Sequence, residues 1–199
     1  MKTIYSIIAF LTLFNSLFAQ TAFVGHIGGY DSEVPNGMIT DHSGNIIICG
    51  VFDDSVDFDM SGAVFQLTNI NFYDGFIAKY DSLGSFIWAK QFGTYINAIE
   101  VDEFDNIYAT GTLEGTKDVD PSAATFNLTS NGLTDAAMIK LTPSGNFIAA
   151  INIGGAGDDG MASIKANDAG EIYVSGGFLD AVDFDPSGPV FSMTPSNMG

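Results

Sequence analysis

The sequence predicts an all-β protein: a β-propeller of four-stranded antiparallel blades, with about three blades present and the propeller incomplete. Three observations lead to this fold class. The chain repeats itself with a period of roughly 60 residues, each unit reads as short strands separated by turns, and no window has the 3.6-residue periodicity of an amphipathic helix. A lone sheet cannot bury both of its faces, and stacking against neighbouring units solves this problem. A β-sandwich is the structural alternative, although a sandwich does not need such uniform repeats.

The repeat is clearest in three short stretches: "GNIIICG" (44–50) realigns with "DNIYATG" (105–111) and "GEIYVSG" (170–176). A longer stretch, "DGFIAKYDSLGSFIWAKQFG" (74–93), realigns with "DAAMIKLTPSGNFIAAINIG" (135–154). We therefore expect residues 21–199 to form β-propeller repeats in three units, the last one truncated: approximately 21–93, 94–154 and 155–199. Because a closed propeller needs about four to eight blades, we expect this chain to be the N-terminal part of a longer one, with closure by oligomerisation as the alternative.

Each unit is expected to hold four main strands, the first of them of the "GMITD" type. The second strand, "NIIICGVF" (45–52), is apolar almost throughout, which predicts burial on both of its faces. The third strand, "GFIAKYD" (75–81), alternates and leads through the turn "DSLG", where glycine suits a positive φ, into the fourth strand, "SFIWAKQFG" (85–93). An insertion between the second and third strands holds an acidic turn and a short strand of the "VFQLT" type (64–68).

The first 20 residues have the layout of a secretory signal peptide. Lys2 precedes an apolar run from about Ile4 to Leu13, and a more polar segment then ends at the small residue Ala19. The apolar run is short for a membrane span, which needs about 20 residues. We therefore predict a signal peptide at 1–20, no membrane span after its removal, and a secreted protein that is extracellular or on the outer cell surface. An ordinary N-terminal core strand is the alternative.

The composition narrows the classes of partner. The chain has 24 acidic residues against six lysines and no arginine, a formal net charge of −18. Proteins that bind nucleic acid or anionic membranes carry a basic surface, so we expect neither partner. Cys49 is the only cysteine, which excludes an intramolecular disulfide, and its counterparts Thr110 and Ser175 favour a small buried residue over a nucleophile.

One acidic turn is written three times, as "VDFDMSG" (56–62), "KDVDPSA" (117–123) and "VDFDPSG" (182–188). Its alternate oxygen-bearing side chains match the first half of a calcium loop, but the bidentate glutamate of such a loop is missing from every copy. The other interpretation is a structural turn in which the aspartates cap backbone N–H groups and the residue between them packs inward. The calcium interpretation predicts a weak site in each copy, formed by Asp57, Asp59 and Ser61, by Asp118, Asp120 and Ser122, and by Asp183, Asp185 and Ser187.

The remaining candidates are weaker. His26 and His42 are the only histidines, and with no nucleophile elbow in the sequence we interpret both as isolated surface residues. Adjacent acids in turns, such as those at 53–54 and 158–159, are interpreted as solvated loop residues rather than a glycosidase pair. The repeated acids and lysines of the third strand are expected to form exposed ion pairs, namely Asp74 with Lys79 and Asp135 with Lys140.

In combination, these stretches resemble a known family. "GNIIICGVFDDSVDFDMSG", "DGFIAKYDSLGSFIWAKQFG" and "GGAGDDGMASIKANDAGEIYVSGGFLDAVDFDPSG" are similar to SBBP repeats, the seven-bladed β-propeller type, as found in exported proteins of Bacteroidetes-like bacteria. The resemblance covers almost all of residues 21–199. It implies a large extracellular or surface-associated protein, in a family mostly without a demonstrated reaction.

Two functional classes follow. The first is a non-catalytic extracellular scaffold or binding module that recognises a protein or a glycan, and it predicts repeated features without a unique polar cluster. The second is a propeller enzyme (a hydrolase, a lyase or quinoprotein-like) whose site lies in blades absent from this chain. We expect the first class, with no catalytic residue, no certain cofactor and at most Ca²⁺ as a ligand, because the distinctive polar residues recur from unit to unit.

Overall fold

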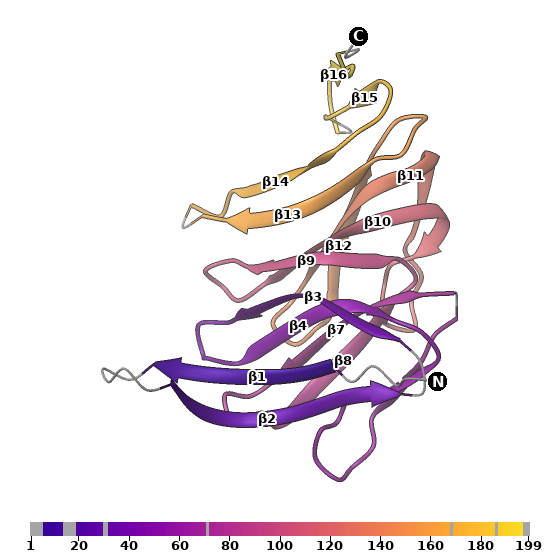
Figure 1. The fold of residues 1–199 in the computed structure, drawn as a ribbon. Coiled ribbons are helices and arrows are strands. Elements are labelled where there is room, and N and C mark those ends of the chain that lie inside the picture. Colours follow the sequence, from indigo (N-terminus) through magenta and orange to yellow (C-terminus); the bar gives the residue numbers. More distant parts are fainter. Residues whose placement is uncertain are drawn as a thin grey trace.

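The structure is a computed structural model that describes residues 6–13, 19–29, 32–70, 72–167, 169–185 and 187–196. The described residues form antiparallel sheets of two to four strands and no helix (Figure 1), so the all-β prediction is confirmed. It follows that no helix in this part of the chain could cross a membrane.

Two sheets have the same four-stranded order and follow one another along the chain. The first runs β3-β4-β7-β8, from β3 (Glu33–Thr40) through β4 (Ile46–Phe52) and β7 (Asp74–Tyr80) to β8 (Phe86–Phe92). The second consists of β9 (Tyr95–Val101), β10 (Ile107–Asp118), β11 (Asn127–Leu141) and β12 (Phe147–Ile153). A third sheet contains β13 (Gly160–Ala166) and β14 (Ile172–Gly177). The predicted four-strand pattern is therefore confirmed in both complete units.

The insertion lies where the sequence predicts it, between the second and third strands of each unit. In the first unit it forms β5 (Ser55–Asp57) and β6 (Gln66–Thr68), and after β14 it forms β15 (Val182–Asp183) and β16 (Ser192–Met193). In the second unit the expected short strand is instead continuous with β11, because β10 and β11 stay paired on both sides of an irregularity between Glu114 and Thr116.

At the N-terminal end, β1 (Ser6–Leu13) pairs with β2 (Ala19–Gly29), and the end of β2 pairs with β5. Strand β1 lies within the predicted signal peptide, whose residues 1–5 and 14–18 fall outside the described part of the chain. Cleavage of a leader at 1–20 would remove β1 and leave β2 paired with β5. The signal peptide stays a prediction.

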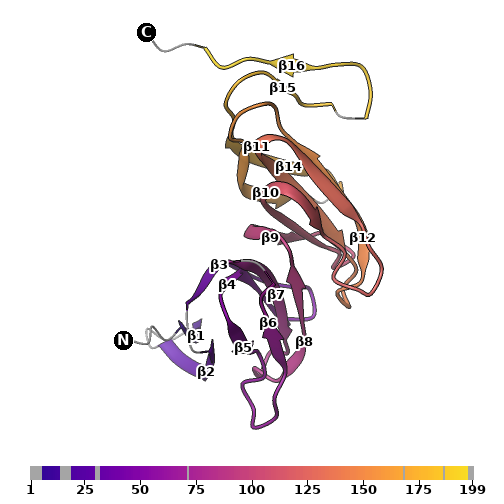
Figure 2. The ribbon, with the colours of Figure 1, turned by 90° about the vertical axis from the view of Figure 1, so that its right-hand side faces the viewer.

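The sheets stack face to face, with their first strands side by side (Figures 1 and 2). Strand β3 packs against β9, and β9 packs against β13. The stacking explains why β4 is buried at every position, as its continuous apolar sequence predicts. Its odd-numbered residues Ile47 and Cys49 face the second sheet, while Ile46, Ile48 and Phe52 join a separate cluster toward the N-terminal side. Each large apolar side chain buried in this way contributes about 1.5–3 kcal/mol.

Candidate functional site

The acidic turn of the first unit closes on itself through its aspartates. The Oδ1 atom of Asp57 accepts hydrogen bonds from the backbone N–H groups of Asp59, at 3.0 Å, and Phe65, at 2.9 Å. Asp59 Oδ1 in turn accepts from the backbone N–H of Ser61, at 2.9 Å. The carboxylates therefore supply acceptors that a tight turn needs for its unpaired donors.

The other two turns repeat this pattern atom for atom. Asp118 Oδ1 accepts from the N–H groups of Asp120 and Phe126, and Asp183 Oδ1 accepts from those of Asp185 and Phe191. The residue between the aspartates points the other way, as expected: Phe58 and Val119 are completely buried. Phe184, at the same position of the third turn, is 37% exposed.

These contacts account for the conserved spacing within the repeat without a metal. In each turn, one carboxylate oxygen of the first aspartate accepts hydrogen bonds from two backbone N–H groups. Within the described ranges, no group of three or more His, Cys, Asp or Glu side chains is arranged to hold a metal ion. The turn-capping interpretation is thus observed directly. Weak calcium binding at the nine predicted residues is not tested by this geometry and stays a prediction.

A second repeated aspartate, at the start of the third strand, is completely buried and anchors the insertion. Asp135 accepts hydrogen bonds from the backbone N–H of Asn131, at 3.1 Å, and from Asn152 Nδ2, at 2.6 Å. Asp74 repeats the arrangement with the N–H of Ile70 and Nε2 of Gln91. The amide of the fourth strand also reaches the insertion backbone, so the acid, the amide and the insertion form one network.

The expected ion pairs of the third strand are wrong in partner, and the pair that Lys79 makes is buried rather than exposed. Lys79 Nζ lies 2.8 Å from Asp41 Oδ2, with both side chains almost fully buried, and Lys140 Nζ lies 4.0 Å from Asp102 Oδ2. Asp41 and Asp102 come from the turn after the first strand, which the sheet brings beside the lysine. Burial by itself would raise the pKa of Asp41, but hydrogen bonds from Lys79 and Asn45 outweigh it and lower the pKa.

Asp159, one of the adjacent acids that the sequence predicts to be a solvated loop residue, is buried in the structure. Asp159 is 4% exposed and accepts hydrogen bonds from the N–H groups of Gly155, at 2.6 Å, and Leu179, at 2.8 Å. Glu33 makes the corresponding contact with the N–H of Gly29 in the first unit. The acid at the start of the first strand therefore holds the preceding chain segment in place through its backbone N–H groups. A pair of adjacent acids in the sequence does not reveal this role.

His42 is not isolated, because its Nδ1 lies 2.7 Å from Oδ1 of Asp105 in the neighbouring unit. This hydrogen bond, reinforced by the carboxylate charge, raises the pKa of His42. Cys49 is buried as predicted, and burial raises the pKa of its thiol to about 12, so the thiol is protonated at neutral pH.

The candidate binding site is a hollow of about 720 Å³ at the start of the first strands. Its lining combines amides, acids and apolar side chains from all three units: Asn36, Asn97, Asp158, Met161, Phe178 and Leu179 are among them. Sequence reasoning missed Asn36 and Asn97, although both recur at the repeat spacing. Asn36 Nδ2 donates to the carbonyl of Ile96, at 2.8 Å, and Asn97 Nδ2 donates to that of Met161, at 3.2 Å, so each amide joins two neighbouring sheets.

Comparison with known proteins gives one distant likeness. No protein-family model matches the chain. Over 93 residues it is 36% identical to an uncharacterized WD repeat-containing protein of Acanthamoeba polyphaga mimivirus, an alignment that covers 43% of this chain and 7% of that protein. The chain therefore corresponds to a small part of the length of this relative. The likeness agrees with a repeat protein of the β-propeller type.

Proposed function

We propose that this chain forms consecutive blades of a β-propeller and serves as a non-catalytic scaffold or binding module. The observation that carries the proposal is the repeated joint between units. Four-stranded sheets with the order β3-β4-β7-β8 and β9 to β12 meet through their first strands, and the same asparagine-to-carbonyl bond crosses each joint. WD repeats are four-stranded propeller blades, so the distant relative supports the same architecture.

We further propose that the protein is exported and that these blades are the N-terminal part of a longer secreted chain of the SBBP type. The signal-like segment at 1–20 supports export. The net charge of −18 suits an extracellular surface without nucleic-acid or anionic-membrane partners. The polar residues that repeat between units are engaged in turns, joints and anchors, which supports a scaffold rather than a reaction centre.

The hollow at the start of the first strands is the proposed binding surface, and its ligand is a protein or a glycan. Asn97 and Asp158 provide hydrogen-bonding groups there, while Phe178 and Leu179 provide apolar contact area. Sites that combine a few polar groups with an apolar wall are typical of ligand recognition. The side chain of Leu179 is 55% exposed, so it is available to a ligand without supporting the core.

A glycan array and a panel of immobilised extracellular proteins would test this proposal. The matched variants are Leu179→Glu in the hollow and Leu83→Glu in the turn between β7 and β8, since Leu83 is 79% exposed and lies outside the hollow. We expect a ligand whose affinity falls about tenfold with Leu179→Glu and is unchanged with Leu83→Glu. Equal effects of the two variants, or no retained ligand, would contradict the assignment.

A further inference from the structure

Strand β14 differs from its counterparts in having a hydrogen-bonded neighbour on one side only within the described part of the chain. Strand β4 pairs with both β3 and β7, and β10 pairs with both β9 and β11, whereas β14 pairs with β13 alone. We propose that the free edge of β14 takes up an extended segment of the β7 and β11 type, whose lysine binds between Glu171 and Tyr173. This inference rests on the proposed longer propeller.

Two side chains of β14 are exposed where their counterparts in β10 are covered. Tyr108 is 7% exposed and its counterpart Tyr173 is 59% exposed, while Ala109 at 0% corresponds to Val174 at 41%. Strand β10 has β11 along its edge and the third sheet packed against it, whereas β14 has neither a second paired strand nor a following sheet within the described part of the chain. One further strand would therefore cover part of this surface.

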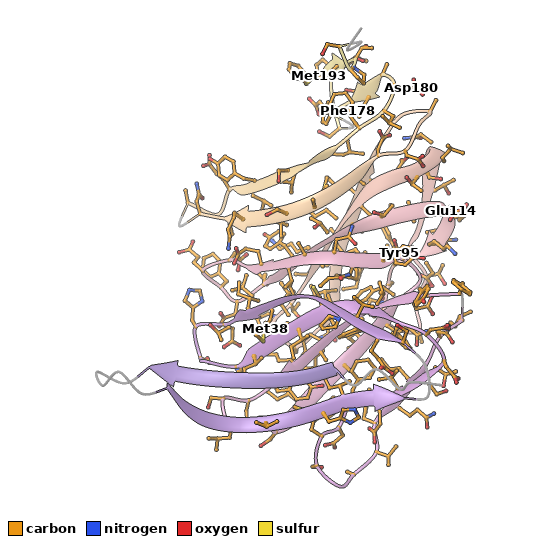
Figure 3. All side chains as sticks on the ribbon, viewed as in Figure 1. Met38, Tyr95, Glu114, Phe178, Asp180 and Met193 are labelled. Atoms are coloured by element: carbon orange, nitrogen blue, oxygen red, sulfur yellow. The ribbon has the colours of Figure 1, made fainter. Side chains whose placement is uncertain are left out.

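An apolar hollow of about 360 Å³ lies on the face of β14 that looks toward the second sheet. Its lining includes Val174, Phe178, Phe184 and Met193, and Figure 3 labels Phe178 and Met193 near the C-terminal end of the stack. In the first unit the corresponding place is filled from the third strand. There the ring of Phe76, which is paired with Gly50, lies 5.0 Å from the ring of Phe58. A residue opposite Gly176 would enter the hollow in the same way, since directly paired residues share a face.

At the other end of β14, a carboxylate and an aromatic ring lie where the second unit binds a lysine. In the second unit Lys140 Nζ lies over the ring of Tyr108, 4.7 Å from its centroid, and 4.0 Å from the Asp102 carboxylate. That carboxylate also accepts hydrogen bonds from Asn106 Nδ2 and the Tyr108 hydroxyl.

The third unit keeps this arrangement with its acid and amide exchanged in sequence. Asn167 stands where the other units have aspartate, and Glu171 stands where they have asparagine. Glu171 Oε2 accepts from Asn167 Nδ2, at 2.7 Å, and from the Tyr173 hydroxyl, at 2.9 Å. The amide, the ring and the carboxylate are therefore all present, and the lysine that the other two units supply from the third strand is the missing member. The same two hydrogen bonds lower the pKa of Glu171, which keeps it ionised.

The register of the two complete units defines the occupant. Lysine is paired with Ile47 in the first unit and with Tyr108 in the second, so the incoming lysine lies opposite Tyr173. By the same alignment an apolar residue lies opposite Gly176 and an aspartate opposite Phe178. We assign this segment to the third strand of the same repeat in the proposed longer chain, because both of its known examples, β7 and β11, follow the second strand of their own unit.

The test adds a synthetic peptide with the sequence of residues 135–154, which spans a third strand, its turn and a fourth strand, to the 199-residue chain. Hydrogen exchange should slow at the backbone amides of β14 that face the free edge. A peptide carrying Lys140→Glu should bind about fivefold more weakly. The Glu171→Lys chain should reverse this preference, and Glu171→Gln should reduce the difference between the two peptides.

Three results would overturn the inference. The first is an unchanged hydrogen-exchange rate in β14 at saturating peptide. The second is a peptide affinity that does not change when the charge at Glu171 is removed or reversed. The third is protection of β14 without peptide that grows with protein concentration, which would assign the edge to a second copy of the chain. The readout is confined to β14, so it can fail while ligand binding at Leu179 succeeds, and the proposed function is judged separately.

Discussion

Replacement of Asp57 by alanine isolates the contribution of one acidic turn to stability. The Asp57 carboxylate accepts two backbone hydrogen bonds, from Asp59 at 3.0 Å and from Phe65 at 2.9 Å, and the second closes a loop of the insertion. Asp57 is half-buried, so loss of these bonds is comparable to loss of an aspartate cap, about 1–2 kcal/mol. For a domain of this size the midpoint of thermal unfolding should fall by roughly 2–8 °C.

The matched variant Asp57→Asn separates capping from calcium binding. Asparagine keeps the Oδ1 acceptor and caps about as well as aspartate, so we expect a cost below roughly 0.5 kcal/mol. A hard cation such as Ca²⁺ depends on the carboxylate charge, and asparagine would weaken its binding. Thermal and urea unfolding of the wild type and both variants, each with chelator and with millimolar calcium, provides the measurement.

If Asp57 only caps the turn, the wild type and the two variants should keep the same order of stability in chelator and in calcium. Only the Asp57→Ala variant should then be markedly destabilised. Wild-type stability in Asp57→Ala would refute the worked magnitude. A calcium-dependent gain in the wild type that both variants lose would instead establish the cation site.

Three further substitutions test the repeated anchors. Asp135→Ala removes a completely buried acceptor and leaves amide donors unpaired, so urea unfolding should show a loss of about 3 kcal/mol. Lys79→Met leaves the buried carboxylate of Asp41 without its cation and should cost about 3–5 kcal/mol. The double variant with Asp41→Asn removes that charge but keeps an acceptor for the N–H groups of Ser43 and Asn45, so it should recover part of the loss. The pKa of His42, measured by NMR titration, should lie above its ordinary range and fall in Asp105→Asn. Because this pKa is raised by folding, the stabilisation is complete in acid and is lost as the pH rises through it.

Each of these predictions can fail on its own. Unfolding of Asp135→Ala at the wild-type urea concentration would show that the insertion does not depend on that anchor. Additive losses in Lys79→Met and Asp41→Asn would show that the two side chains are not coupled. A His42 titration that is indifferent to Asp105→Asn would remove the contact between the two turns.

Features set by nearby residues were predictable from the sequence. The apolar run of β4 predicted burial on both faces, and the turns between third and fourth strands contain Gly84 and Gly145 at positive φ, as their sequences suggest. The inward direction of Phe58 follows from the two-residue alternation of an extended chain. These features depend on backbone geometry within a few residues, and the repeat reports each of them more than once.

Partners supplied by another strand or another unit were not predictable in the same way. Lys79 and Asp74 lie in the same strand, but the lysine binds Asp41, which the sheet brings beside it, and the aspartate binds the insertion and Gln91. The sequence predicts that Asp159 is a solvated loop residue, but in the structure it is buried and accepts a hydrogen bond from the backbone N–H of Gly155. Strand pairing in the sheet, rather than distance along the chain, therefore decides which polar groups form hydrogen bonds.

The amino-acid sequence by itself determined the all-β class, the repeat, the four-strand order of a unit and the acidic turn in its insertion, because periodicity and turn chemistry are local. Only the tertiary structure decided what the polar residues of the repeat do. Stacking placed Asn36 and Asn97 across the joints, buried Asp135 beneath the insertion, and left Glu171 and Tyr173 exposed beside the edge of β14. The physical reason is that burial and hydrogen-bond partners depend on which surfaces meet, and that is settled when the sheets pack together.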